Sequence, residues 1–290
     1  MPAEIDNETR RLELPRPEFI FGTTAGMREI RATIERAAQD NLPVLIQGES
    51  GTGKEMLSRY LHQQWGSGDE PFLKLNCGAA LASLVEGEIF GIEKTTAARG
   101  HESKSGLIEF ASGGTLFLDE IEGMDISLQR KVAHTLESGR YRRIEGREDL
   151  TVDARFVCAT SIDLEAELRN CVVAELLGHF VHRVRLLPLR ERREDIPQLC
   201  EYLLAKFASD FGRPIPHLSS RAVEALQQWK WPGNIRELEN WIARIVIFGA
   251  EEVVGFEFKR QLAAGENSIA KYHHVSHPRS ARMRRPRSHR

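Results

Sequence analysis

Cysteine is scarce in this chain, and its four residues are widely separated. They are Cys77, Cys158, Cys171 and Cys200. No two of them have the close spacing of a metal-binding pair, which excludes a cysteine metal site and favours reduced thiols, as in a cytosolic protein. Cys77 and Cys158 lie in apolar, strand-like runs, so we expect both in the core.

Long hydrophobic runs are also missing. No uncharged apolar stretch approaches the roughly 18 residues that a membrane-spanning helix needs, and even residues 241–250 are interrupted by Arg244. Residues 1–10 hold three acidic side chains and no apolar segment, which excludes a secretory signal there. We therefore expect a cytoplasmic protein that has no membrane partner.

Net charge is small, at −2, but it is unevenly distributed. Residues 271–290 carry seven Lys or Arg and no acid, whereas residues 1–270 hold 33 basic and 42 acidic side chains, a formal −9. The tail has the composition of a disordered segment. Its positive charge predicts weak contact with DNA through phosphates, and a merely solvated tail is the alternative.

The most informative stretch is a glycine-spaced loop between a strand-like run and a helical one. Its residues are Gly48, Glu49, Ser50, Gly51, Thr52, Gly53 and Lys54, followed by Glu55. Free N–H groups at a helix start bind phosphate, and Lys54 adds a charge for the β- and γ-phosphates. Glu55 stands where the full pattern has a hydroxyl ligand for Mg²⁺. The flanking strand and helix favour phosphate binding over a plain glycine turn.

A second stretch, 113–120, is an apolar strand that ends in Asp119 and Glu120. The carboxyl ends of parallel strands are where α/β proteins bind ligands. There Asp119 can hold Mg²⁺ while Glu120 polarises a water molecule. A helix-capping turn is the alternative, but the phosphate loop 65 residues earlier favours the nucleotide interpretation.

Strand-like and helical runs alternate through the first two thirds of the chain. The strand-like runs are 44–47, 71–76, 113–120, 154–160 and 184–187, and the charged stretch 137–149 suggests a hairpin. This order predicts an α/β fold in which helices flank a parallel sheet. Phe19, Ile20 and Phe21 either pack in the core or line an apolar adenine pocket.

Beyond residue 188 only helical periodicity remains, which predicts a small all-helical domain. Asn234 and Glu237 have the spacing of a capping pair at the start of its last helix. Arg236 in that first turn opposes the helix dipole, so it either acts elsewhere or is an ordinary surface arginine. The expected segments are a flexible leader 1–17, an α/β subdomain 18–188, a helical lid 189–250 and a basic tail 251–290.

These features resemble the AAA+ central domain of bacterial enhancer-binding proteins, the sigma-54-dependent transcription activators. Five blocks are similar and occur in the family's order: 48–55, 75–77, 113–120, 188–192 and 231–238. The resemblance implies an AAA+ P-loop NTPase fold with a helical lid, and it accounts for Glu55. It also implies ring-shaped oligomers, hexamers in the family, with ATP and Mg²⁺ between subunits.

The resemblance also implies roles for individual residues. Lys54 would contact the phosphates, Asp119 would hold Mg²⁺ and Glu120 would activate water. Asn76 would be the polar switch for Glu120, and Arg236 would sense the γ-phosphate from the lid.

Three positions depart from the family pattern. Residues 95–100 lack the aromatic anchor with which the family grips the sigma factor, and such anchors carry much of an interface's energy. Ser161 replaces the longer sensor asparagine. The segment 170–180 contains no arginine, so His179 and Val173 stand where two trans-acting fingers are expected. Since arginine fingers contribute about 10³–10⁵ in rate, we expect impaired hydrolysis and sigma-54 contact.

Three hypotheses follow from the sequence. The first is an ATP-binding transcription regulator whose nucleotide state controls oligomerisation and contact with the sigma-54 RNA polymerase holoenzyme or another transcription component. The second is an active ring ATPase that remodels a different target. The third is a nucleotide-gated partner of an intact homologue. The sequence leaves open whether ATP is hydrolysed, and we expect neither a receiver nor a helix-turn-helix domain in it.

Overall fold

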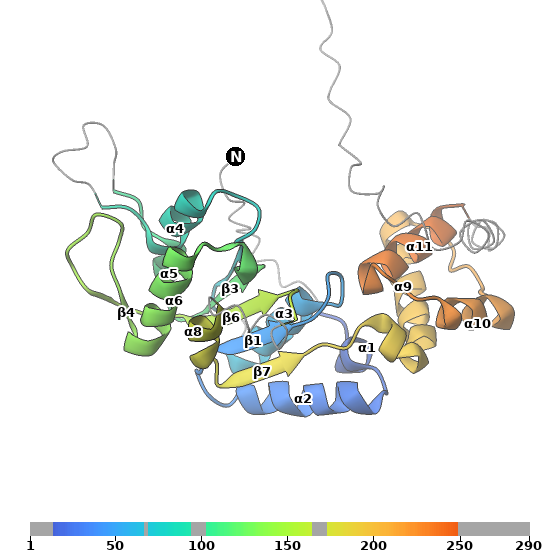
Figure 1. Ribbon diagram of the computed structural model, residues 1–290. Helices are drawn as coiled ribbons and strands as arrows, with labels where there is room; N and C mark the ends of the chain where they lie inside the picture. The colour runs from blue at the N-terminus through green and yellow to red at the C-terminus, as the bar shows by residue number, and fades with distance from the viewer. Residues whose placement is uncertain (1–13, 67–68, 94–102, 164–172, 249–290) are drawn as a thin grey trace, which may run out of the picture.

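The computed structural model describes residues 14–66, 69–93, 103–163 and 173–248 of the 290-residue chain (Figure 1). The expected sigma-contact segment 95–100 and the basic tail therefore lie outside the described residues, as does most of the leader. In the part that is described, no helix is long and apolar enough to cross a membrane.

A five-stranded parallel sheet, in the order β2-β3-β6-β1-β7, forms the centre of the α/β part. Its strands are β1 (Val44–Gln47), β2 (Phe72–Asn76), β3 (Thr115–Asp119), β6 (Arg155–Thr160) and β7 (His182–Arg185). This confirms the predicted fold class. The last strand begins two residues earlier than expected. Since β7 is an edge strand in which only Val184 is buried, no apolar residue marks its start in the sequence.

Side chains alternate across the sheet, so each strand contributes to two apolar layers. Leu45 packs in one layer and its neighbours Val44 and Ile46 in the other. The first layer is covered by α4 (Ala82–Phe90), α5 (Leu107–Phe110), α6 (Ile126–Ser138) and α8 (Val173–Gly178), and the second by α2 (Ala25–Ala37) and α3 (Lys54–Trp65). Cys77 and Cys158 are fully buried, as predicted.

A short antiparallel hairpin projects from the α/β part beyond α6 (Figure 1). It consists of β4 (Arg140–Tyr141) and β5 (Leu150–Thr151). The charged, glycine-containing stretch 137–149 therefore does form the connection that its sequence suggested.

The remaining described chain is a helical lid with its own apolar core. It contains the 3₁₀ turns η3 (Leu189–Glu191) and η4 (Arg193–Asp195), followed by α9 (Ile196–Phe211), α10 (Ser220–Gln228) and α11 (Asn234–Phe248). Trp231 is completely buried, and its indole N–H donates to the carbonyl of Leu226 at 2.8 Å. The predicted helical domain is confirmed.

A short helix, α1 (Pro17–Phe21), joins the lid to the α/β part. Phe19 stacks on Tyr202 of α9 with ring centroids 4.8 Å apart, and Phe21 meets Tyr60 of α3 edge to face at 5.1 Å. Both rings are thus engaged in packing between elements, which supports core packing over an adenine pocket.

Candidate nucleotide-binding site

The glycine loop connects β1 to α3, as its sequence indicates. Gly51 and Gly53 have positive φ angles of 77° and 102°, which glycine adopts without steric cost. A Cβ on Gly51 would lie 2.4 Å from the carbonyl oxygen of Gly233, so the lid backbone rests directly on the loop. Because α3 begins at Lys54, its first N–H groups have no intrahelical acceptor and are suited to an anion.

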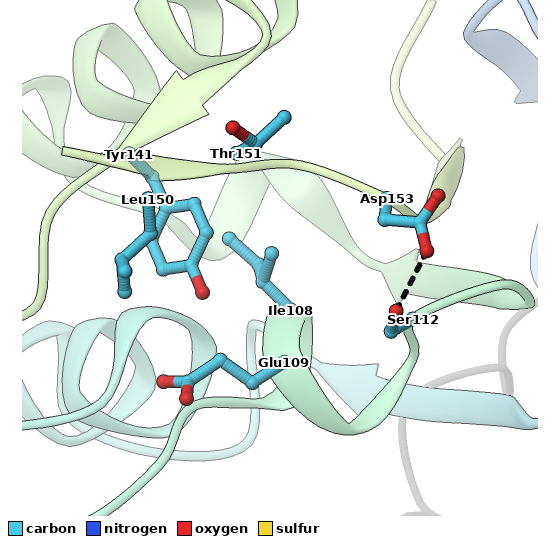
Figure 2. Close-up of a pocket in the computed structure, with 7 residues that line it drawn as sticks. All are labelled: Ile108, Glu109, Ser112, Tyr141, Leu150, Thr151 and Asp153. Atoms are coloured by element: carbon cyan, nitrogen blue, oxygen red, sulfur yellow. Dashed lines mark hydrogen bonds between the residues drawn. The ribbon is translucent and has the colours of Figure 1, made fainter.

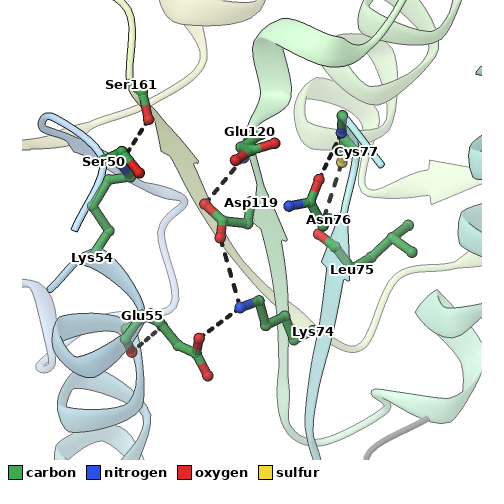
Figure 3. A network of polar contacts seen from close by, with 12 residues as sticks. Ser50, Lys54, Glu55, Lys74, Leu75, Asn76, Cys77, Asp119, Glu120 and Ser161 are labelled. Atoms are coloured by element: carbon green, nitrogen blue, oxygen red, sulfur yellow. Dashed lines mark hydrogen bonds and ion pairs between the residues drawn. The ribbon is translucent and has the colours of Figure 1, made fainter. Parts of the chain in front are cut away.

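Lys54 is folded over its own loop. Its ammonium donates to the carbonyl oxygens of Gly48 at 2.7 Å and Glu49 at 3.2 Å, and to the hydroxyl of Ser161 at 2.8 Å (Figure 3). Only 8% of the residue is exposed. Burial lowers the pKa of Lys54, although the negative charge of Asp119 opposes this effect.

Asn76 and Asp119 are the last residues of the paired strands β2 and β3 and are partners in their register. The two predicted side chains therefore lie together at the carboxyl end of the sheet. Burial raises the pKa of Asp119, while Lys74 and Lys54 oppose the rise. One oxygen of Asp119 accepts the backbone N–H of Glu120 at 3.1 Å.

Glu120 has a left-handed backbone with φ 55°, which is uncommon for a residue other than glycine. A Cβ on Gly78 would lie 2.6 Å from the Oε2 atom of Glu120 and 3.5 Å from the Oδ1 atom of Asn76. The same Oδ1 atom accepts the N–H of Gly78 at 2.8 Å. The predicted switch residue is thus brought close to Glu120, although its hydrogen bond is to Gly78.

Glu55 forms ion pairs with two cationic side chains. Its carboxylate accepts from Lys74 at 2.6 Å and lies 2.9 Å from Arg59, and Lys74 is also 3.7 Å from Asp119 (Figure 3). Burial raises the pKa of Glu55, but Lys74 and Arg59 together lower it further than burial raises it. Sequence reasoning missed Lys74, although its position two residues before Asn76 places both on one face of β2.

Hydrogen bonds join the lid to the phosphate loop, chiefly at the loop residue Glu49 and the lid residue Asn234. Arg190 donates to both carboxylate oxygens of Glu49, at 2.8 and 2.6 Å, which lowers the pKa of that carboxyl. The amide of Asn234 donates to Glu49 at 3.2 Å and to the Ser50 carbonyl at 3.0 Å, and its oxygen accepts from Leu189.

The prediction that Asn234 and Glu237 cap the last helix together is therefore wrong for Asn234. Glu237 does reach back, but to the N–H of Gly233 at 2.8 Å. Asn234 is fully buried and has φ 52°, and its side chain serves the phosphate loop instead of its own helix.

The start of α11 meets the loop directly. The N–H groups of Ile235 and Arg236 lie 2.9 and 3.3 Å from the carbonyl of Gly51, and the Arg236 guanidinium donates to the Ser50 hydroxyl at 3.2 Å. Of the two alternatives for Arg236, this contact favours a task at the loop.

Two further polar groups were missed from the sequence, the buried Arg192 and the half-buried Glu122. Arg192 is 2% exposed and donates to the carbonyl of Thr52 at 3.1 Å, and burial lowers its pKa to about 10. Glu122 accepts the N–H of Ser161 at 2.9 Å and so fixes the residue at the sensor position. Arg192 lies in a block that the family resemblance had marked, but Glu122 carried no signal.

Of the two positions expected to hold arginine fingers, Val173 begins α8 and His179 follows its end, half-buried.

The residues present fit a nucleotide phosphate chain and a hard cation. The loop is closed by glycines and leads into an open helix start, with an ammonium in place. Asp119 supplies the carboxylate oxygen that Mg²⁺ prefers, and Mg²⁺ usually completes its shell with water and phosphate.

A separate pocket of about 260 Å³ lies between α5 and the β4–β5 hairpin (Figure 2). Its lining residues are Ile108, Glu109, Ser112, Tyr141, Leu150, Thr151 and Asp153. A hydrogen bond of 2.7 Å joins Ser112 to Asp153 at its edge. None of the candidate site residues lines this pocket, so it is not the nucleotide site.

A phosphate loop at the carboxyl end of a parallel sheet, covered by a helical lid, defines a P-loop nucleotide-binding protein of AAA+ type. Comparison with known families specifies which one. The sigma-54 interaction domain model matches residues 20–189, and the AAA+ ATPase lid domain model matches residues 190–271. The chain belongs to the sigma-54 interaction domain family of sigma-54-dependent transcriptional activators, which confirms the resemblance seen in the sequence.

Similar proteins include the response regulator protein PilR of Pseudomonas aeruginosa, 40% identical over 80% of this chain and 53% of that protein. The Nif-specific regulatory protein of Azotobacter vinelandii is 38% identical over 81% of this chain and 45% of its own length. A crystal structure of NtrX from Brucella abortus in complex with ATP has a TM-score of 0.72 and 33% identity, covering 80% and 51% of the two chains. The chain thus spans about half the length of these relatives.

Proposed function

We propose that this chain binds ATP with Mg²⁺ and acts as an AAA+ transcription regulator whose nucleotide state controls oligomerisation and partner contact. The observation that carries the proposal is that Lys54 and the lid residue Arg236 converge on one phosphate loop. A solved relative, NtrX from Brucella abortus, is in complex with ATP. The division into an α/β subdomain 18–188 and a lid 189–250 is part of the proposal.

Each site residue has a proposed task. Lys54 releases its loop carbonyls and Ser161 to contact the β- and γ-phosphates, while the loop N–H groups bind the phosphate oxygens. Asp119 would hold Mg²⁺, which when bound neutralises phosphate charge. Glu120 orients the attacking water, Asn76 controls the position of Glu120, and Arg236 senses the γ-phosphate from the lid.

The proposed partners follow from the family. They are further copies of this chain in a ring, a hexamer by resemblance, and the sigma-54 RNA polymerase holoenzyme or another transcription component. DNA contact through residues 271–290 is included, because seven cations without an acid favour phosphate binding. A cytoplasmic location is part of the same proposal.

A second candidate is an active ring ATPase that remodels a different target. It is favoured by the close approach of Asn76 and Glu120 around Gly78 at the carboxyl end of the strands, since these are the two side chains with a proposed task in hydrolysis. The missing arginines in 170–180 and the sensor Ser161 favour impaired hydrolysis instead.

ATP binding and turnover by the purified chain distinguish these candidates, with Lys54→Ala and Glu120→Gln as controls. ATP binding with negligible turnover supports the regulator. Turnover above roughly 1 s⁻¹ that is lost in both variants selects the ring ATPase. Turnover that occurs only after mixing with an intact homologue indicates the nucleotide-gated partner.

A further inference from the structure

Lys74 places a fixed positive charge beside the proposed metal position. Its ammonium lies 2.6 Å from Glu55 and 3.7 Å from Asp119, and Figure 3 shows it between the two carboxylates. Lys74 is in β2, and Asp119 ends the paired strand β3. About a third of the lysine side chain is exposed, so water screens the contact only in part.

Glu55 holds this ammonium in place and is itself occupied. Its Oε2 atom accepts from Lys74 and its Oε1 atom lies 2.9 Å from Arg59. In the general phosphate-loop pattern, the residue after the lysine carries a hydroxyl that binds Mg²⁺. This chain instead has a carboxylate there, already paired with two cations, and one of those cations also approaches Asp119.

We propose that Lys74 is a built-in counter-cation of the nucleotide site, held by Glu55, which takes over part of the charge neutralisation that Mg²⁺ supplies. Nucleotide binding then depends less on Mg²⁺ than it would without Lys74. Lys74 positions charge and does not touch reacting atoms. The inference rests on the proposed binding of ATP.

Two effects of opposite sign follow from one charge. The ammonium attracts nucleotide phosphates, so it strengthens ATP binding in the absence of Mg²⁺. It also reduces the negative potential around Asp119, so it weakens Mg²⁺ binding to the nucleotide complex. For a partly screened charge at such a distance, each effect amounts to about three- to tenfold in affinity.

The test is ATP binding by the full chain, measured by calorimetric titration with Mg²⁺ and again in EDTA. The readout is a ratio, in which the dissociation constant of ATP measured in EDTA is divided by the one measured with Mg²⁺. For Lys74→Met we expect this ratio to rise by about three- to tenfold, because by linkage the ratio changes only with the affinity of Mg²⁺ for the nucleotide complex. The loss of ATP affinity is measured separately, as a dissociation constant in EDTA that is about three- to tenfold higher. Lys74→Arg retains the charge and is expected to keep a ratio near that of the wild type.

Arg59→Met is the matched control, because it removes the other cation from Glu55 without a contact to Asp119. Its ratio should equal that of the wild type, and thermal unfolding verifies that each variant is folded. Should Lys74→Met fail to fold, Lys74→Gln replaces it.

An unchanged ratio in Lys74→Met or its substitute, or an equal rise in Arg59→Met, overturns the inference while ATP binding itself stands. A wild-type chain that binds no ATP under either condition overturns the proposed function and this inference together.

Discussion

Both carboxylate oxygens of Glu49 accept hydrogen bonds from the guanidinium of Arg190, at 2.8 and 2.6 Å. Glu49 belongs to the phosphate loop, and Arg190 belongs to the first turn of the lid. Asn234, at the start of α11, donates to the same carboxylate. The lid and the phosphate loop are therefore linked by side chains, so a ligand that moves the loop also acts on the lid.

A double-mutant cycle with Glu49→Gln and Arg190→Met measures this link. We expect a coupling free energy of about 1 kcal/mol, because bidentate geometry strengthens the pair while exposure weakens it. The two side chains are 43% and 39% exposed. Urea unfolding of the four proteins gives the value, and strictly additive effects would contradict the proposed coupling.

The same pair predicts a pH dependence. The pKa of Glu49 lies below its ordinary value of 4.5 in the folded chain, so its stabilisation is present above that value and lost as pH falls through the lower folded pKa. The destabilisation caused by Arg190→Met should therefore shrink in acid. An effect of equal size at neutral pH and below the folded pKa would exclude a charged pair.

Gly78→Ala should separate nucleotide binding from hydrolysis. Its Cβ would lie 2.6 Å from the Oε2 atom of Glu120, and that side chain can move aside, so the fold should survive while Glu120 is displaced. We expect residual ATP turnover to fall about tenfold or more, and the ATP dissociation constant to change less than about twofold.

Gly87→Ala is the control for this experiment, because its new Cβ would have its closest contacts at an ordinary 3.5 Å, with Ile92. Turnover in Gly78→Ala that matches Gly87→Ala would show that Glu120 has no role at this position.

Trp231→Ala should destabilise the lid. The indole is completely buried, meets Trp241 edge to face and donates to the Leu226 carbonyl. Loss of a buried tryptophan costs about 3–5 kcal/mol, which is large for one small helical domain. Circular dichroism during urea unfolding checks this value, and a loss below about 1 kcal/mol would disagree with the packing described.

Local sequence patterns predicted the parts of the site that depend on neighbours along the chain. The strand before Gly48, the lysine at the helix start and the acidic pair after β3 follow from periodicity and turn chemistry alone. The sequence could not show which long-range partner a polar side chain selects. Asn234 has a normal capping context, but Glu49 and Ser50 compete successfully for its amide.

Lys74 illustrates a second limit. Its distance from Asp119 depends on the register between β2 and β3, which a single sequence does not specify. Edge strand β7 shows the same limit for the fold, because only one of its residues is buried. Interactions across the sheet and between lid and loop, rather than local propensity, decide these features.

The most direct test of the account is calorimetric titration of ATP into the full chain and into Lys54→Ala. We predict saturable binding with one ATP per chain in the wild type. Affinity should be at least about tenfold weaker in Lys54→Ala, equal to about 1.4 kcal/mol or more. The absence of ATP binding in the wild type, or equal affinity in both proteins, would contradict a nucleotide site at this loop.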